Sequence, residues 1–106
     1  MLRGETSFAE MVKESFREGL TALIGKSGME AVYINFKLQD NLMNPKATHQ
    51  ALVPAFKERG AEILERAVAK ELFRRIDERY EPGDNFSYEH QFNRARELFV
   101  ARQIKE

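Results

Sequence analysis

The sequence predicts an all-α protein: a compact bundle of four or five helices in a single domain that spans residues 1–106. Two observations lead to this fold class. Apolar residues recur at helical spacing through most of the chain, and serines and glycines stand where helices would begin and end. In addition, only one segment alternates as a strand does, and a lone strand would leave its backbone polar groups unsatisfied.

The first helix is predicted over about residues 8–24. Ser7 and Glu10 match a capping box, in which the two side chains satisfy free amides at a helix start. Apolar residues then recur at helical spacing as far as Ile24. Gly19 lies inside this helix at a cost of roughly 1 kcal/mol relative to alanine, so we expect it to permit close approach by a neighbouring helix.

A corner is predicted at residues 25–30. Gly25 stands just past the apolar run, where a left-handed residue commonly ends a helix, and Ser27 with Glu30 repeats the capping-box pattern. The segment that follows alternates as a strand does, but it also has helical spacing. Because a capping box belongs to a helix start, we expect a second helix over about 28–38.

A third helix is predicted to start at about residue 45. Asn44 and Pro45 favour this start, because asparagine caps helices and proline suits the first helical position. Pro54 is expected to break or kink the helix near Val53, since a proline in a helix removes a hydrogen bond and clashes with the preceding turn. Gly60 marks the next corner.

The strongest helical pattern covers about residues 61–79. Its apolar arc is wide, which is typical of the central helix of a bundle. Residues 81–86 form a linker rich in turn-forming residues. A last helix is predicted over about 87–103, either docked on the central helix or shared between the subunits of a dimer.

The last helix contains the candidate partner or dimer interface: Tyr88, Phe92 and Phe99. Together with Ala95 they recur at alternating steps of four and three, the spacing of two helices packed side by side. Packing within the same chain is favoured over a second subunit, because two heptads are short for a stable coiled coil.

The composition excludes several classes of protein. The chain has no cysteine, which rules out disulfides, thiolate catalysis and cysteine-ligated metals. Basic and acidic residues number 17 each, so the net charge gives no global attraction to nucleic acid or to an anionic membrane. With no signal-peptide pattern and no apolar run of about 18 residues, we expect a soluble, cytoplasmic protein without a membrane partner.

No motif predicts catalysis, and we expect no catalytic residue, cofactor or metal. Gly25-Lys26-Ser27 looks like the end of a phosphate-binding loop, but five residues separate it from Gly19 where that loop has four. The two histidines, His49 and His90, lie in separate segments and lack the spacing to carboxylates that metal-binding helices use. The hydroxyl residues stand at helix caps or without a recognisable nucleophile motif.

Charged residues cover one side of the helix at 61–79. Glutamates alternate with arginines along this helix, a pattern typical of a solvent-exposed face. The glutamates are Glu62, Glu65, Glu71 and Glu78. Arg66, Lys70 and Arg74 form a basic row at successive steps of four, a candidate contact for an anion or nucleic acid. A solvated face is the favoured interpretation, because nearby acidic residues dilute the charge and no aromatic residues are interleaved.

The order of elements resembles a small all-helical archaeal family described as an output domain in ammonia-oxidising archaea. The similarity rests on residues 23–28, on Ala51-Leu52 with Phe56, and on residues 60–65 leading to Glu71-Leu72. It covers about residues 8–76, and neither Pro54 nor the C-terminal helix belongs to the pattern. The resemblance implies a signalling or partner-binding module and carries no catalytic residues.

The sequence therefore predicts a non-enzymatic protein-interaction or signal-output module. A homodimer through the last helix is one form of this function. The alternative is a small nucleic-acid-binding module that uses the basic row.

Overall fold

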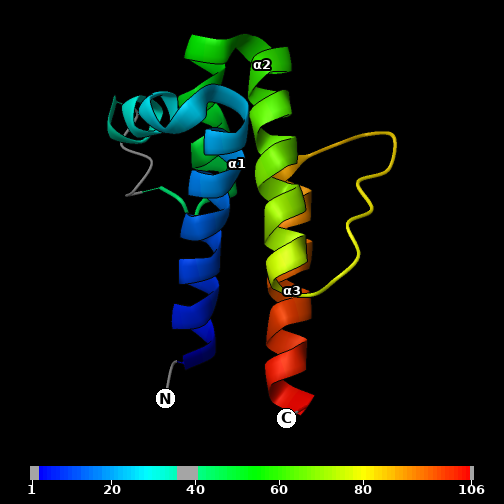
Figure 1. Ribbon diagram of the computed structural model, residues 1–106. Coiled ribbons are helices and arrows are strands. Elements are labelled where there is room, and N and C mark those ends of the chain that lie inside the picture. The colour runs from blue at the N-terminus through cyan, green and yellow to red at the C-terminus, as the bar shows by residue number, and fades with distance from the viewer. Residues whose placement is uncertain (1–2, 36–40, 106) are drawn as a thin grey trace.

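The computed structural model describes residues 3–35 and 41–105, with side chains described for 8–35 and 41–102. Three helices form the fold: α1 (Arg3–Asn35), α2 (Pro45–Arg75) and α3 (Tyr88–Lys105) (Figure 1). No strand occurs in the described ranges, so the predicted all-α class is confirmed. The predicted count of four or five helices is not supported, because two of the expected corners are bends inside α1 and α2.

The bend in α1 lies at Gly25, where φ is 81° and ψ is 168°. This region is essentially restricted to glycine, so the predicted left-handed residue is confirmed, although the helix resumes at once. The start was predicted wrongly, because α1 begins at Arg3 and Ser7 lies inside it. Residues 29–35 are helical and not a strand. Residues 36–38 lie outside the described ranges.

The start of α2 is confirmed at Asn44. Its side-chain Oδ1 accepts a hydrogen bond from the backbone amide of Ala47 at 3.0 Å, and Pro45 opens the helix. The break was expected near Val53 but lies at Lys57, where φ is 64° and ψ is 171°. The helix therefore passes through Pro54 before it bends, and the chain then reverses direction (Figure 1).

Gly60 allows this reversal of the chain because it has no side chain to collide with Phe56. A Cβ at this position would lie 3.0 Å from the Cβ of Phe56, and the backbone of Gly60 itself is not left-handed. The two parts of α2 consequently form a helical hairpin, which places residues 45–56 beside the early part of residues 58–75.

The end of α2 differs from the prediction by four residues. The helix ends at Arg75, because Asp77 adopts a left-handed φ of 59°. The Asp77 amide donates to the Arg74 carbonyl at 3.1 Å, and the Glu78 amide donates to the Phe73 carbonyl at 2.9 Å. This pair of bonds is the Schellman motif, which satisfies the last carbonyls of a helix.

α2 packs against both other helices, and its second part contacts α1 at Val68 and α3 at Phe73, in agreement with the predicted central helix. Gly19 makes the close approach that the sequence predicted: a Cβ there would lie 3.1 Å from the backbone nitrogen of Val68. The buried apolar core extends through all three helices. Between α1 and α3 it contains an aromatic seam, made of Phe8, Phe16, Tyr88, Phe92 and Phe99.

Candidate functional site

The predicted dimer interface on the last helix lies inside the core. Tyr88, Phe92 and Phe99 are almost fully buried. The Phe92 ring meets Phe8 edge to face at a centroid distance of 5.5 Å, and the Tyr88 ring meets Phe16 at 6.1 Å. The helical spacing was recognised correctly, but it marks packing within one chain, so these side chains do not offer a surface to a partner.

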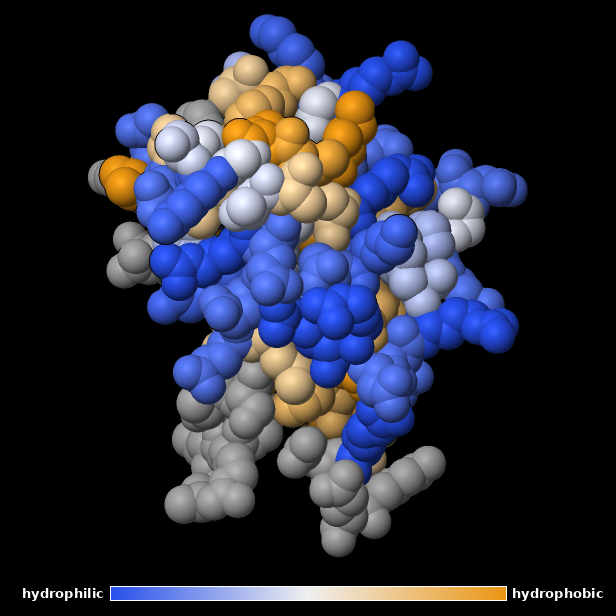
Figure 2. Space-filling model, in the orientation of Figure 1, coloured by the Kyte–Doolittle hydropathy of each residue, from blue (hydrophilic) through white to orange (hydrophobic). Residues whose placement is uncertain are grey.

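An exposed apolar surface lies instead where α1 and α2 bend, at the top of Figure 1. Leu23, Ile24 and Ile63 expose 47%, 36% and 52% of their surface. We call these three residues the kinked-end patch. Figure 2 shows apolar side chains gathered over this end of the molecule, between charged surfaces.

The helix register explains why these residues lie together. α1 and the second part of α2 run in opposite directions (Figure 1), and they meet where Gly19 approaches the backbone of Ala67 and Val68. Extrapolating this crossing by one turn along each helix predicts that Leu23 lies near Ile63, because residues four apart share a helix face. The patch therefore lies on the solvent-facing edge of the α1–α2 contact, where Ile63 adjoins the core residue Leu64.

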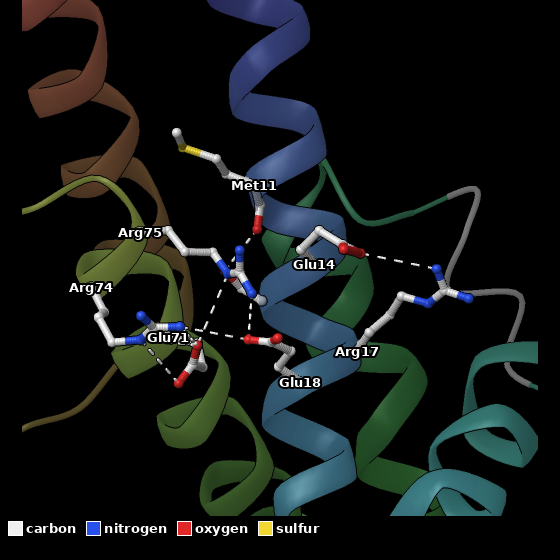
Figure 3. Close-up of polar contacts among 8 residues, drawn as sticks. Met11, Glu14, Arg17, Glu18, Glu71, Arg74 and Arg75 are labelled. Carbon is white, nitrogen blue, oxygen red and sulfur yellow. Dashed lines mark hydrogen bonds and ion pairs between the residues drawn. The ribbon is translucent and has the colours of Figure 1, made fainter.

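The basic row is largely neutralised by carboxylates of the same chain. Nε of Arg66 donates to Glu62 at 2.8 Å, and Arg74 binds Glu71 at 2.8 Å and Glu18 at 3.6 Å. Figure 3 shows Glu18 of α1 reaching toward the arginines of α2. Within the described residues, Lys70 alone of the row has no ion-pair partner. The row therefore stabilises helix contacts more than it presents free charge.

A pocket of about 360 Å³ lies beside the α2 hairpin and the start of α3. Its walls come from both parts of the hairpin and from residues 86–89. We call it the hairpin pocket, and its ionisable lining residues are Lys46, His49, Glu58, Glu62, Glu65, Tyr88 and Glu89. Ligand sites commonly have volumes of about 300–1,000 Å³, so the pocket has the size of a small site.

His49 and Glu65 join the two parts of the hairpin across the pocket wall. Nδ1 of His49 donates to Oε2 of Glu65 at 2.6 Å, and Nε2 lies 3.4 Å from Oε1 of Glu58. Burial by itself lowers the pKa of His49, but the hydrogen bond and charge of Glu65, aided by Glu58, raise it on balance. Both ring nitrogens face carboxylates, an arrangement that favours the protonated imidazole.

Glu65 was assigned to a solvated face from its sequence, and this assignment is wrong. The side chain is 2% exposed, and burial raises the pKa of its carboxyl while His49 acts in the opposite direction. One signal in the sequence indicates this burial: Ala61 and Ala69 stand four residues to either side, so Glu65 lies in the apolar arc. Its hydrogen-bond partner, His49, is sixteen residues away, so the pairing cannot be recognised from neighbouring residues in the sequence.

Tyr88 contributes a polar group that the protein leaves unsatisfied. The residue lines the hairpin pocket, is 3% exposed, and its buried hydroxyl has no hydrogen-bond partner. Burial raises the pKa of this hydroxyl, and the charge of Glu65 raises it further. The phenol therefore stays protonated and remains available as a donor near the His49–Glu65 pair.

The other predicted histidine takes no part in the pocket. His90 is exposed on α3, and its backbone amide donates to the Ser87 Oγ at 3.3 Å, which confirms Ser87 as a helix cap. In the parts of the chain that the structure describes, no group of three or more histidine or carboxylate side chains could hold a metal ion.

Comparisons with known proteins returned no relatives: no family model, no curated protein and no solved structure matches this chain. The resemblance to an archaeal output-domain family stays a prediction. Among the described residues, no helix combines the length and the apolar character needed to cross a bilayer.

Proposed function

We propose that the chain is a non-enzymatic protein-interaction module that pairs with a second copy of itself through the kinked-end patch. The observation that supports this proposal most is the exposure of three large apolar side chains, Leu23, Ile24 and Ile63, where α1 and α2 bend. Exposed apolar surface shared by two helices commonly marks a contact with another protein. A second copy supplies an apolar surface of equal extent through an isologous contact, the commonest symmetry among oligomers.

The surroundings of His49 support a non-enzymatic role. A general base must have a free ring nitrogen within reach of the proton that it removes, whereas both ring nitrogens of His49 face carboxylates. The Oγ of Ser87, the serine of the pocket lining, accepts a hydrogen bond from the backbone amide of His90 as a helix cap. In a signal-output role, which the family resemblance implies, the kinked-end patch would be the surface that contacts the signalling partner.

Sedimentation equilibrium of the purified chain over a range of concentrations tests this proposal. We expect the mass to rise toward that of two chains for the wild type and to stay at one chain for the double variant Leu23→Ser/Ile63→Ser. Because both side chains are exposed, their replacement should change stability by no more than about 0.5 kcal/mol.

Val100→Ser is the matched control, since Val100 is an exposed apolar residue of α3, 40% accessible and outside the patch. It should pair as the wild type does. A wild type that remains a single chain at every concentration contradicts pairing, and equal loss in the control shows that the patch is not the contact.

A further inference from the structure

We propose that the hairpin pocket binds an organic cation, an ammonium or guanidinium group carried on an aliphatic stem. The pocket is separate from the kinked-end patch, so this inference does not depend on self-pairing. It rests on an excess of carboxylates, on a buried hydroxyl without a partner, and on an aromatic wall.

Carboxylates outnumber cations around the pocket. Its lining includes four glutamates against one lysine and one histidine. His49 is committed to Glu65 and Glu58, and Arg66 offsets Glu62 at the rim. The lining still carries uncompensated negative charge, and a cation entering a partly enclosed site gains more from this charge than it would in open solvent.

The unpartnered hydroxyl of Tyr88 is a second, independent observation that favours a ligand site here. A buried hydroxyl without a hydrogen bond lowers stability. The Tyr88 side chain with this hydroxyl lines the pocket, and the charge of Glu65 contributes to the raised pKa of the hydroxyl. The hydroxyl oxygen can accept a hydrogen bond from an ammonium or guanidinium group.

The chain itself shows how a guanidinium fits beside this wall. The Arg66 guanidinium lies over the Phe86 ring, with its carbon 4.7 Å from the ring centroid, and is held by Glu62 at 2.8 Å. A cation over an aromatic face and beside a carboxylate is a favourable arrangement. Phe86 and Pro45 also line the pocket and provide apolar surface for an aliphatic stem.

Isothermal titration calorimetry at low salt tests the site with three probes: agmatine, putrescine and the capped tripeptide Gly-Arg-Gly. We expect saturable binding of at least one probe at a single site. Binding of agmatine or putrescine without the tripeptide identifies a free amine as the ligand, and tighter binding of the tripeptide identifies a basic side chain of a protein. No binding of any probe at millimolar concentration overturns the proposal.

Tyr88→Phe separates ligand binding from stability. The change removes an unsatisfied hydroxyl, so the variant should fold at least as well as the wild type, yet it should bind the probe several-fold more weakly. Tyr33→Phe is the matched control, because Tyr33 also has a buried hydroxyl without a partner but lines a different pocket. Equal affinities for the wild type and Tyr88→Phe contradict the role of the hydroxyl.

Glu58→Gln/Glu89→Gln removes two exposed carboxylates from the pocket rim without touching the core. We expect a loss of affinity of about tenfold, because hydrogen bonds to charged groups are strong. Glu97→Gln on the outer side of α3 changes the net charge by one unit away from the pocket and should have no effect on affinity. If Glu97→Gln weakens binding as much as the rim variant, the probes bind by general surface charge and the pocket proposal fails.

Discussion

The aromatic seam and the kinked-end patch both use apolar residues of α1, but only the seam is closed within the chain. Phe8 contacts Phe99 of α3, and Phe16 contacts Tyr88, so the two helices run in opposite directions and α3 begins opposite Phe16. The next turns of α1 have no part of α3 beside them, and Leu23 remains exposed. The seam is closed because α3 covers α1 as far as Phe16, whereas Leu23 lies on α1 beyond the start of α3.

The largest effect is expected in the seam. Phe92→Ala removes a fully buried ring that contacts Phe8 and Tyr88, and such replacements cost about 3–5 kcal/mol. Urea unfolding followed by circular dichroism measures the loss. A loss below about 1 kcal/mol would mean that α3 is not docked on α1 as described.

A smaller loss is expected where α1 crosses α2. Gly19→Ala introduces a Cβ at 3.1 Å from the backbone nitrogen of Val68. Because this overpacking outweighs the better helix propensity of alanine, the variant should lose about 1–2 kcal/mol of unfolding free energy. At Gly28 an added Cβ would lie 3.1 Å from the Cβ and Cγ1 of Ile24, an exposed side chain of the same helix, and not against the backbone of another helix. Gly28→Ala should therefore cost less than Gly19→Ala, and equal losses at both glycines would contradict the crossing.

A gain is expected at the bend of α2. Lys57 adopts a conformation that is costly for any residue with a Cβ, so Lys57→Gly should raise the free energy of unfolding by about 1 kcal/mol after the entropic cost of glycine. Thermal unfolding of the variant and the wild type measures the gain.

Two variants serve as controls for this bend. Lys57→Ala keeps a Cβ and should give no gain, and Gly25→Ala places a Cβ into the equivalent conformation of α1, where it should destabilise. If Lys57→Gly lowers stability, the left-handed conformation at this position is wrong.

The His49–Glu65 pair predicts a pH dependence. Its contacts to Glu65 and Glu58 raise the pKa of His49 above the ordinary value of 6.5, so the folded state holds a proton that the unfolded state releases at lower pH. The stabilisation is complete below about pH 6.5 and is lost as the pH rises through the folded-state pKa. Burial raises the pKa of Glu65 from 4.5, which acts in the same direction.

Urea unfolding midpoints measured from about pH 6.5 to about pH 8.5 check this dependence. The wild type should lose stability across this range, and His49→Gln should lose less. His90→Gln is the control, since His90 makes no side-chain ion pair among the described residues. A flat wild-type profile contradicts the pairing across the hairpin.

Features set by a few neighbouring residues could be predicted from the sequence. The Asn44 cap with Pro45, the Ser87 cap and the positive φ of Gly25 all depend on residues within about one helical turn. The close approach at Gly19 was also predicted, because a glycine inside a helix lowers helix stability and close packing against another helix can offset this loss.

Features set by distant residues could not be predicted. Lys57 is the wrong residue type for its conformation, so the sequence gives no sign of the bend there. The carboxylate of the buried Glu65 is paired by His49, which comes from the other part of the hairpin, and the patch lies on α1 and α2 beyond the part of α1 that α3 covers. The seam spacing was found, but spacing alone does not distinguish an interface between chains from a core within one.

Amide hydrogen exchange of the wild type at low and high protein concentration, about 10 μM and about 1 mM, tests the central claim most directly. If the kinked end is the interacting surface, exchange should slow with concentration at residues 20–24 and 60–64, while the amides of α3 stay unchanged. Exchange that is independent of concentration, or that slows along α3 instead, would contradict the claim.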